Sequence, residues 1–384
     1  MGDLLDPQAV AEARTWRRDL HRHPELGFAE HRTAAFLAER LTAWGYEVAT
    51  GIAGTGVVAS LTRGESGRSI GIRADIDALP ITEETGADWA SATPGVMHAC
   101  GHDGHTSMAL AAAKALAGAA FDGTVRFIFQ PAEENDGGGR EMVKAGLFDR
   151  FPVDTVYALH NWPGLKPGQI VARDDAMMAA FAVFEITVTG RGAHGAMPHE
   201  GADCLLAASH IVAALQSIAA RNVSPLESAV VSVTQIHGGD AWNVLPERAV
   251  IRGTTRWFLP EVGDRIETRL TRIAQSVAEG LGCSAGVRYE RRYPPTINAR
   301  EPAARVRRAA EAAGLQVMPA DPSMAAEDFA FLLDKVPGCY FWLGAGREGD
   351  NPGLHSARFD FNDEILETGA AFWIRLVQQE LPAA

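Results

Sequence analysis

The feature that most constrains the fold is the order of strand-like and helix-like segments along the chain. Between residues 48 and 160, short β-branched or apolar segments such as 69–73 and 125–130 alternate with helical segments such as 106–120. This alternation is typical of a mostly parallel sheet that helices cover on both faces. From about residue 177 the order becomes strand, helix, strand, strand, helix, strand, which is the order of a ferredoxin-like unit.

Segments of the α/β type resume near residue 294. The ferredoxin-like unit is therefore inserted into the α/β domain. We therefore predict an α/β fold with a mostly parallel-sheet domain, formed by residues 1–176 and 294–384, and an inserted ferredoxin-like α+β domain, formed by residues 177–293. A chain of 384 residues has more residues than a domain with a single hydrophobic core usually contains, which favours two domains.

The charge of the chain excludes several classes of protein. The formal net charge is −13, which disfavours a nucleic-acid partner and gives no attraction toward anionic membranes. The first residues lack a basic start followed by an apolar run, so we expect a cytoplasmic protein. The four cysteines show no paired spacing, which agrees with a reducing compartment.

The densest group of reactive side chains lies in the segment MHACGHDGH, residues 97–105. It contains Cys100, His102, Asp103 and His105, with His98 just before them. Thiolate and imidazole groups two residues apart suit borderline divalent metals. The alternative is a Gly-rich turn with exposed histidines, which would explain one histidine but not three beside a cysteine and an aspartate.

A second group, Glu133 and Glu134 in PAEE, directly follows the predicted strand 125–130. One carboxylate can bind a cation while its neighbour takes a proton from metal-bound water. We assign Glu134 as the ligand and Glu133 as the general base, since adjacency keeps the base within reach of that water. An isolated Glu-Glu pair is usually a solvated surface feature, and its position after a buried strand favours a site.

Other candidates also follow strand-like or loop segments. His160 lies at a strand end and His355 lies near the C-terminus, where each alone would be unremarkable. Asp75 and Asp77 follow a strand, and such acids often orient ligand histidines. Together the candidates exceed what one tetrahedral site holds, which predicts two metal ions with a shared ligand.

Nine motifs carry a resemblance to a known family. In chain order they are RRDLHRHPELGF, GIRADIDALPI, MHACGHDGHTSMALAAA, FQPAEE, ALHNWPGLKPG, GRGAHGAMPHEGAD, AWNVLPERAVIRGTTR, EDFA and LHSARFDFND. The chain resembles the M20 metallopeptidase family, in particular its amidohydrolase branch of N-acyl amino acid amidohydrolases, hippurate hydrolases and auxin-conjugate hydrolases. The resemblance covers nearly the whole chain.

The resemblance implies a role for individual residues. Cys100 would bridge two metals, and the remaining ligands would be His102, Glu134, His160 and His355. Glu133 would be the general base and later the proton donor to the leaving amine. His194, from the inserted domain, would stabilise the oxyanion, often across a dimer interface. Asn243 and Arg256 would hold the substrate carboxylate.

The activity implied is metal-dependent hydrolysis of the amide bond of an N-acyl amino acid, or a similar small amide, to a carboxylic acid and a free amino acid. The donor set suits two divalent ions, Zn²⁺ or Mn²⁺ with Co²⁺ or Ni²⁺ as alternatives. We expect a homodimer in which strands of the inserted domain pair edge to edge across a two-fold axis, with a homotetramer as the alternative. Two departures from the family pattern, at Asn135–Asp136 and at Ala325, leave the substrate preference open.

Three other readings stay open at this point. A dipeptidase or small carboxypeptidase would use the same chemistry on a different substrate. A metal-free amidase would use Cys100 as a covalent nucleophile, but it would leave Glu134, His160 and His355 without a role. A non-catalytic metal-binding protein would not need the base Glu133.

Overall fold

The computed structural model describes residues 4–134 and 136–383, so Asn135 lies outside the described residues. The chain forms two compact units. Unit 1 comprises Met1–Met177, Thr296–Asp321 and Asp328–Ala384, and unit 2 comprises Met178–Pro295 and Pro322–Glu327. The structure groups the segment 322–327 with unit 2, whereas the predicted division assigns it to the first domain.

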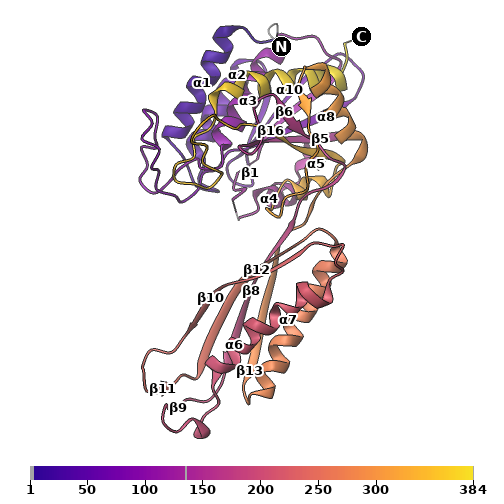
Figure 1. The fold of residues 1–384 in the computed structure, drawn as a ribbon. Coiled ribbons are helices and arrows are strands. Elements are labelled where there is room, and N and C mark those ends of the chain that lie inside the picture. The colour runs from indigo at the N-terminus through magenta and orange to yellow at the C-terminus, as the bar shows by residue number, and fades with distance from the viewer. Residues whose placement is uncertain (1–3, 135, 384) are drawn as a thin grey trace. The chain divides into compact units, whose positions relative to one another are not determined.

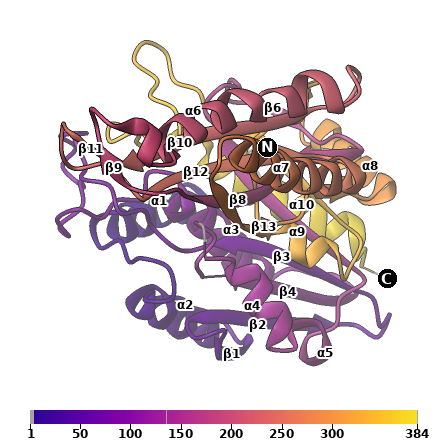
Figure 2. The same cartoon turned by 90° about the horizontal axis from the view of Figure 1, so that it is seen from below.

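Unit 1 is built on an eight-stranded sheet. Its strands in spatial order are β1 (Glu47–Ile52), β2 (Gly56–Arg63), β4 (Gly123–Gln130), β3 (Ser69–Asp75), β5 (Thr155–Trp162), β16 (Gly338–Gly344), β6 (Gln169–Val171) and β15 (Gln316–Val317). The central strands β4, β3, β5 and β16 are parallel, while β1 and β2 form an antiparallel edge. Figure 2 shows β1, β2, β4 and β3 in this order. The predicted mostly parallel sheet is confirmed.

Helices cover both faces of this sheet (Figure 1). The hydrophobic core of unit 1 lies between the sheet and five helices: α1 (Pro7–Arg22), α2 (His31–Ala43), α3 (His102–Leu116), α8 (Arg300–Ala312) and α10 (Leu366–Glu380). Helix α4 (Gly138–Lys144) contacts β4, and the short helices α5 (Leu147–Arg150) and α9 (Ala330–Leu333) pack against α4. Most residues of the central strands are buried because elements cover both of their faces. A 3-10 turn, η3 (Asp363–Ile365), precedes α10.

Unit 2 is a four-stranded antiparallel sheet with two helices on one face (Figure 1). Its elements in chain order are β8 (Ala180–Thr189), α6 (Cys204–Leu215), β10 (Ala229–Gly238), β12 (Arg248–Trp257), α7 (Pro260–Gly280) and β13 (Ser284–Tyr293). The spatial strand order β10-β12-β8-β13 confirms the ferredoxin-like prediction. The 3-10 helix η1 (Pro198–Glu200) and the π-helical segment η2 (Ile218–Asn222) flank α6.

Two small sheets complete the fold. One pairs β9 (Ala193–His194) with β11 (Val244–Leu245) in unit 2, and the other pairs β7 (Asp175–Met178) with β14 (Thr296–Asn298). These short strands have too few residues for a periodic pattern, so the sequence analysis did not predict them.

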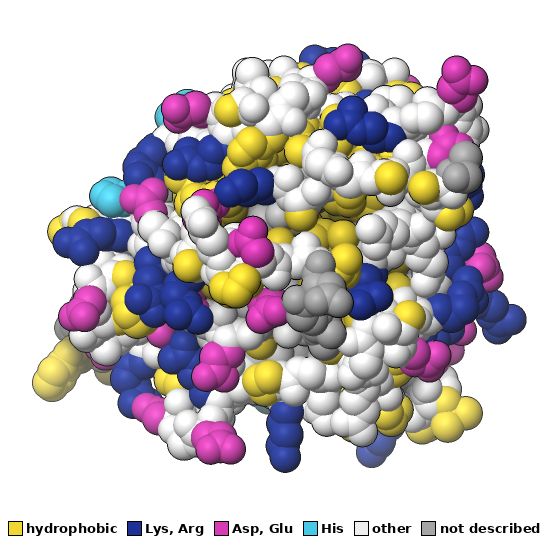
Figure 3. Space-filling view, turned by 90° about the horizontal axis from the view of Figure 1, so that it is seen from above, with side chains coloured by type: hydrophobic (Ala, Val, Ile, Leu, Met, Phe, Trp, Pro, Cys, Tyr) yellow, Lys and Arg dark blue, Asp and Glu magenta, His cyan; other side chains and the backbone are white. Residues whose placement is uncertain are grey.

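On the face seen in Figure 3, Lys and Arg side chains are interspersed with Asp and Glu side chains and do not gather into one basic patch. A nucleic-acid interface would need such a patch. Across the described residues, no helix combines the length and apolar character needed to cross a bilayer.

A buried ionic cluster fixes α1 to the first turn of α3. His21 Nδ1 lies 2.8 Å from Asp103 Oδ2, and His21 Nε2 lies 3.3 Å from Glu83 Oε1. Arg17 Nη1 lies 3.7 Å from the same Asp103 oxygen. Burial by itself would lower the pKa of His21, but the hydrogen bond and charge of Asp103 outweigh it and raise this pKa to about 9. The His21 side chain is therefore an imidazolium at neutral pH.

This cluster predicts a pH-dependent contribution of His21 to stability. Because its folded pKa lies above the unfolded value, the contribution is full below about pH 6.5 and is lost as the pH rises through about 9. A shift of this size corresponds to roughly 3 kcal/mol. Urea unfolding with chelator present should show that His21→Gln destabilises the protein most at pH 6 and much less at pH 9.5. An equal loss at both pH values would contradict this assignment.

Candidate metal centre

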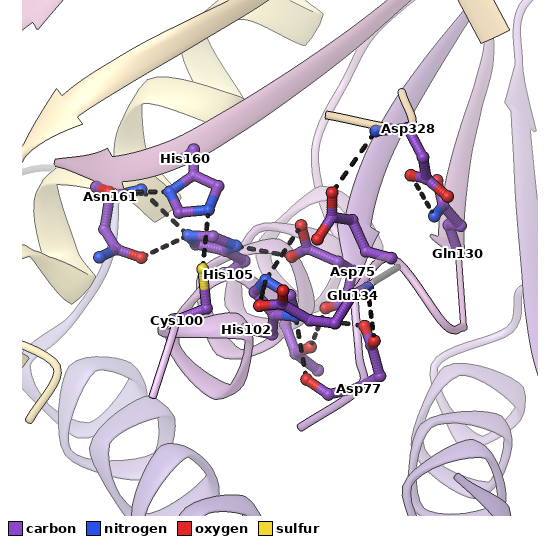
Figure 4. A network of polar contacts seen from close by, with 12 residues as sticks. Asp75, Asp77, Cys100, His102, His105, Gln130, Glu134, His160, Asn161 and Asp328 are labelled. Carbon is purple, nitrogen blue, oxygen red and sulfur yellow. Dashed lines mark hydrogen bonds and ion pairs between the residues drawn. The ribbon is translucent and has the colours of Figure 1, made fainter. Parts of the chain in front are cut away.

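The carboxyl ends of the central parallel strands carry the candidate side chains (Figure 4). Asp75 ends β3, Glu133 and Glu134 follow β4, and His160 lies within the last residues of β5. The carboxyl ends of neighbouring parallel strands meet at the same edge of a sheet, where the sites of α/β proteins lie. Segments far apart in sequence therefore place their polar side chains together.

Helix α3 brings the cysteine–histidine segment to the same edge. It begins at His102, four residues before the predicted start at Thr106, so His102 and His105 lie on its first turn and not on an extended loop. Gly101 allows this early start because its φ of 91° is the left-handed conformation that glycine tolerates. A Cβ on Gly101 would also lie 2.3 Å from Asn161 Oδ1.

The structure brings together the five residues predicted as metal ligands. The donor atoms of Cys100, His102 and Glu134 lie within 4.8 Å of one another. His160 Nε2 lies 3.4 Å from Cys100 Sγ, and His355 Nε2 lies 3.2 Å from Glu134 Oε1. Sulfur, imidazole nitrogen and carboxylate oxygen thus converge on a small volume.

Hydrogen bonds orient both buried histidines toward this volume. His102 Nδ1 lies 2.9 Å from the carbonyl oxygen of Asp77, and His160 Nδ1 lies 2.8 Å from the carbonyl oxygen of Asn161. A carbonyl only accepts, so each Nδ1 carries a proton, and Nε2 is the ring nitrogen that each histidine would offer to a metal. The Asp77 carboxylate also accepts a hydrogen bond from the backbone N–H of Glu134, at 3.0 Å.

Sequence reasoning noted His105 but gave it no role. His105 is buried, with Nδ1 2.6 Å from Asp75 Oδ1 and Nε2 2.6 Å from Asn161 Oδ1. Asp75 Oδ2 also accepts a hydrogen bond from Arg73 Nη1 at 2.7 Å. The signal for His105 was its place in the dense motif. Asn161 and Arg73 lie in the motifs ALHNWPGLKPG and GIRADIDALPI but received no role there.

Buried donor atoms without partners test whether this cluster suits a metal. Among the described residues, His102 Nε2 and Glu134 Oε1 are buried and have no hydrogen-bond partner. The approach of His355 Nε2 to that Glu134 oxygen is close but not aligned as a hydrogen bond. Buried polar atoms without partners are costly, and a cation among them would satisfy both. One thiol, imidazoles and a carboxylate suit borderline divalent metals.

The electrostatics of the cluster also favour a cation. Burial, together with the charges of Glu134 and Glu133, raises the pKa of the Cys100 thiol well above its ordinary value. Burial alone would lower the pKa of His102, but the charge of Asp75 and the contacts with Asp77 raise it to about 10. The site therefore attracts positive charge and opposes a free thiolate.

His355 has an unusual backbone. Its φ of 64° places it in the left-handed region, which is costly for a residue with a side chain. Its N–H donates to the carbonyl oxygen of Ala99 at 2.8 Å, which fixes it beside Cys100. The His355 side chain is 53% exposed, so the cluster opens to solvent on this side.

Glu133 lies beside the donor cluster but is not one of its closest members. It is buried, with Oε1 accepting a long hydrogen bond of 3.4 Å from the backbone N–H of Asp328. The Asp328 carboxylate accepts from Arg73 Nη2 at 3.0 Å and from Gln130 Nε2 at 2.6 Å. The EDFA motif thus contacts the expected base, a link that the sequence analysis did not identify.

Three predicted site residues lie in unit 2. His194 in β9 and Asn243 are exposed neighbours, because β9 pairs with β11 and Gly195 N donates to Asn243 O at 2.7 Å. Arg256 lies toward the other end of β12, with its guanidinium 4.3 Å from the Phe181 ring. At about 3.3 Å per strand residue, Arg256 is roughly 25 Å from the β9–β11 end, so one unit 2 does not bring Asn243 and Arg256 together.

Comparison with known proteins agrees with this geometry. N-acetyl-L-cysteine deacetylase of Bacillus subtilis (strain 168) is 40% identical over 350 residues, covering 89% of this chain and 82% of the relative. Hippurate hydrolase of Campylobacter jejuni is 38% identical over 385 residues, covering 99% and 98%. The crystal structure of the Bacillus subtilis YXEP protein, a dinuclear metal binding peptidase from the M20 family, matches with a TM-score of 0.86 and 34% identity, covering 99% of this chain and 100% of that one.

A family model for peptidase family M20/M25/M40 matches residues 71–379. This span includes every predicted ligand and the whole of unit 2. With the relatives covering most of both chains, the chain belongs to peptidase family M20/M25/M40.

Proposed function

We propose that this protein is a metal-dependent amidohydrolase that cleaves an N-acyl amino acid, or a similar small amide, into a carboxylic acid and a free amino acid. The observation that carries the proposal is the convergence of sulfur, imidazole and carboxylate donors at the sheet edge, with buried donor atoms left without partners. The relatives named as an N-acetyl-L-cysteine deacetylase and a hippurate hydrolase support the substrate class.

We assign the metal-binding role to Cys100, His102, Glu134, His160 and His355. Two divalent ions suit this number of donors better than one tetrahedral ion, and the dinuclear M20 neighbour supports that count. Zn²⁺ or Mn²⁺ fits the mixed donor set, with Co²⁺ or Ni²⁺ as alternatives. When bound, such ions would lower the pKa of water and polarise the substrate carbonyl.

The residues of this chain supply the proton transfers. Glu133 takes the proton from the attacking water and returns it to the nitrogen of the leaving amine. Asp75 and Asp77 orient the histidines, and Asp77 also holds the backbone of Glu134. His194 would donate a hydrogen bond to the oxyanion, a role that rests on its motif alone.

The competing readings are less consistent with the contacts. A nucleophilic Cys100 needs a lowered thiol pKa, but burial and two neighbouring glutamates raise that pKa. A non-catalytic metal protein would leave Glu133 without a role. A dipeptidase or small carboxypeptidase would use the same centre, and only the substrate distinguishes it from a deacylase.

We further propose a homodimer formed through unit 2, with a homotetramer as the alternative. In the part of the chain that the structure describes, β10 pairs with β12 alone and leaves an open sheet edge. Nearby apolar side chains are exposed, at 52% for Ile236, 52% for Val244 and 106% for Trp242, which is typical of an interaction surface. Because Asn243 and Arg256 lie far apart within one unit 2, both could hold one substrate carboxylate only if they came from different subunits. The cytoplasmic location stays a prediction.

A substrate panel tests the proposed function. Purified protein should release free amino acid from N-acetyl or N-benzoyl amino acids, and a chelator should abolish the release until zinc or manganese is restored. Hydrolysis of dipeptides alone would instead identify a peptidase. Hydrolysis that persists in chelator would contradict the metal-dependent mechanism.

Substitutions at the two adjacent glutamates should have different effects. Glu133→Gln removes the base, so turnover should fall by about 10²–10⁴-fold, while the bound metal measured by elemental analysis stays near the wild-type amount. Glu134→Gln removes a ligand, so the metal content itself should fall. Wild-type turnover in Glu133→Gln would show that another group is the base.

Asp77→Ala should weaken metal binding without removing a ligand. The substitution frees the backbone N–H of Glu134 and one carboxylate contact of His102, and loss of such outer contacts weakens metal affinity by about 10–100-fold. Competition with a zinc-binding dye measures the change, with the exposed Asp88→Ala as the control. Equal affinities in the two variants would argue against an orienting role for Asp77.

A further inference from the structure

The turn that carries Glu133 and Glu134 has a strained backbone. Ala132 has a φ of 52°, a left-handed conformation that costs energy for any residue with a Cβ. It packs closely against Gly27, where an added Cβ would lie 2.9 Å from the Ala132 Cβ. Such a conformation persists only where surrounding contacts hold it.

Two buried carboxylates hold the turn on either side of Glu133. The Asp77 carboxylate accepts from the N–H of Glu134 at 3.0 Å. On the other side, Glu30 Oε1 accepts from the N–H of Ala132 at 2.8 Å, across 102 positions of sequence. The backbone donors before and after Glu133 are therefore both fixed by side chains from other segments.

The Glu30 side chain accepts a hydrogen bond from this turn and none from the helix that it precedes. It occupies the N-cap position of α2 but makes no side-chain capping bond there. Glu25 supplies the cap, since its two carboxylate oxygens accept from the N–H groups of Arg32 and Thr33, each at 2.8 Å. The buried Glu30 carboxylate reaches the turn and accepts a second hydrogen bond, of 2.5 Å, from the Thr55 hydroxyl.

We propose that Glu30 is a positioning residue that holds the Ala132 backbone so that Glu133 and Glu134 face the metal centre. Thr55 fixes the orientation of the Glu30 carboxylate, and Gly27 leaves room for the left-handed Ala132. The inference rests on the proposed function, because it assigns Glu30 to the same site. The contact requires a hydrogen-bond acceptor at Oε1, and an amide oxygen meets that need as well as a carboxylate.

The test compares Glu30→Ala and Glu30→Gln with the control Glu25→Ala, which loses two carboxylate–backbone bonds at the same helix start but none at the turn. Glu30→Ala should lower kcat by about 10–100-fold and weaken zinc affinity by a similar factor, with KM nearly unchanged. Glu30→Gln should restore both quantities to near wild type. Glu25→Ala should lower the unfolding midpoint while kcat and zinc affinity stay near wild type.

Two outcomes would overturn the inference. One is a folded Glu30→Ala whose kcat and zinc affinity match those of Glu25→Ala, and the other is a Glu30→Gln as impaired as Glu30→Ala. If Glu30→Ala does not fold, Thr55→Val tests the same contact and should show a smaller loss of kcat and zinc affinity, so unchanged values would reject the role. Zinc affinity is measured without substrate, so the inference can be judged even if the wild-type protein hydrolyses no N-acyl amino acid.

Discussion

Several buried carboxylates lie close together at one edge of the parallel sheet of unit 1, and the surrounding residues must compensate their negative charge. Asp75, Asp77 and Glu133 are nearly inaccessible to solvent, and burying negative charge without compensation is costly. Arg73 offsets part of this charge through its contacts with Asp75 and Asp328. The remaining negative charge surrounds the donor atoms of Cys100, His102 and Glu134, so the arrangement is electrostatically complementary to a divalent cation.

Backbone geometry places these groups as much as side-chain chemistry does. Gly101 starts α3 early, Ala132 bends the chain after β4, and His355 holds a left-handed conformation beside Cys100. Each of these three positions adjoins or is a proposed ligand or adjoins the proposed base. At Ala132 and His355, which carry a Cβ, the left-handed backbone is strained. Hydrogen bonds to distant segments, such as the one that the Ala132 N–H donates to Glu30, counter the cost of this strain.

The fold class could be predicted from the sequence because strand and helix periodicity is a local signal. The ligand candidates could be identified because they lie in short motifs. The sequence pattern placed the start of α3 at Thr106, since a Gly- and His-rich segment resembles a loop until the left-handed Gly101 is known. It did not identify Glu30 or Asp328, because their contacts span 102 and 195 positions of sequence and lone acids usually belong to the surface. The antiparallel strands β1 and β2 were read as strands, but their pairing direction depends on tertiary contacts.

In the proposed mechanism, two divalent ions at the Cys100–His102–Glu134 cluster enable amide hydrolysis. The most direct measurement is a titration of chelator-treated protein with zinc or manganese while the release of amino acid from an N-acyl amino acid is followed. The account predicts no release without metal and full release when about two ions per chain are bound. Full release from metal-free protein, blocked by alkylation of Cys100, would contradict it and identify a cysteine nucleophile.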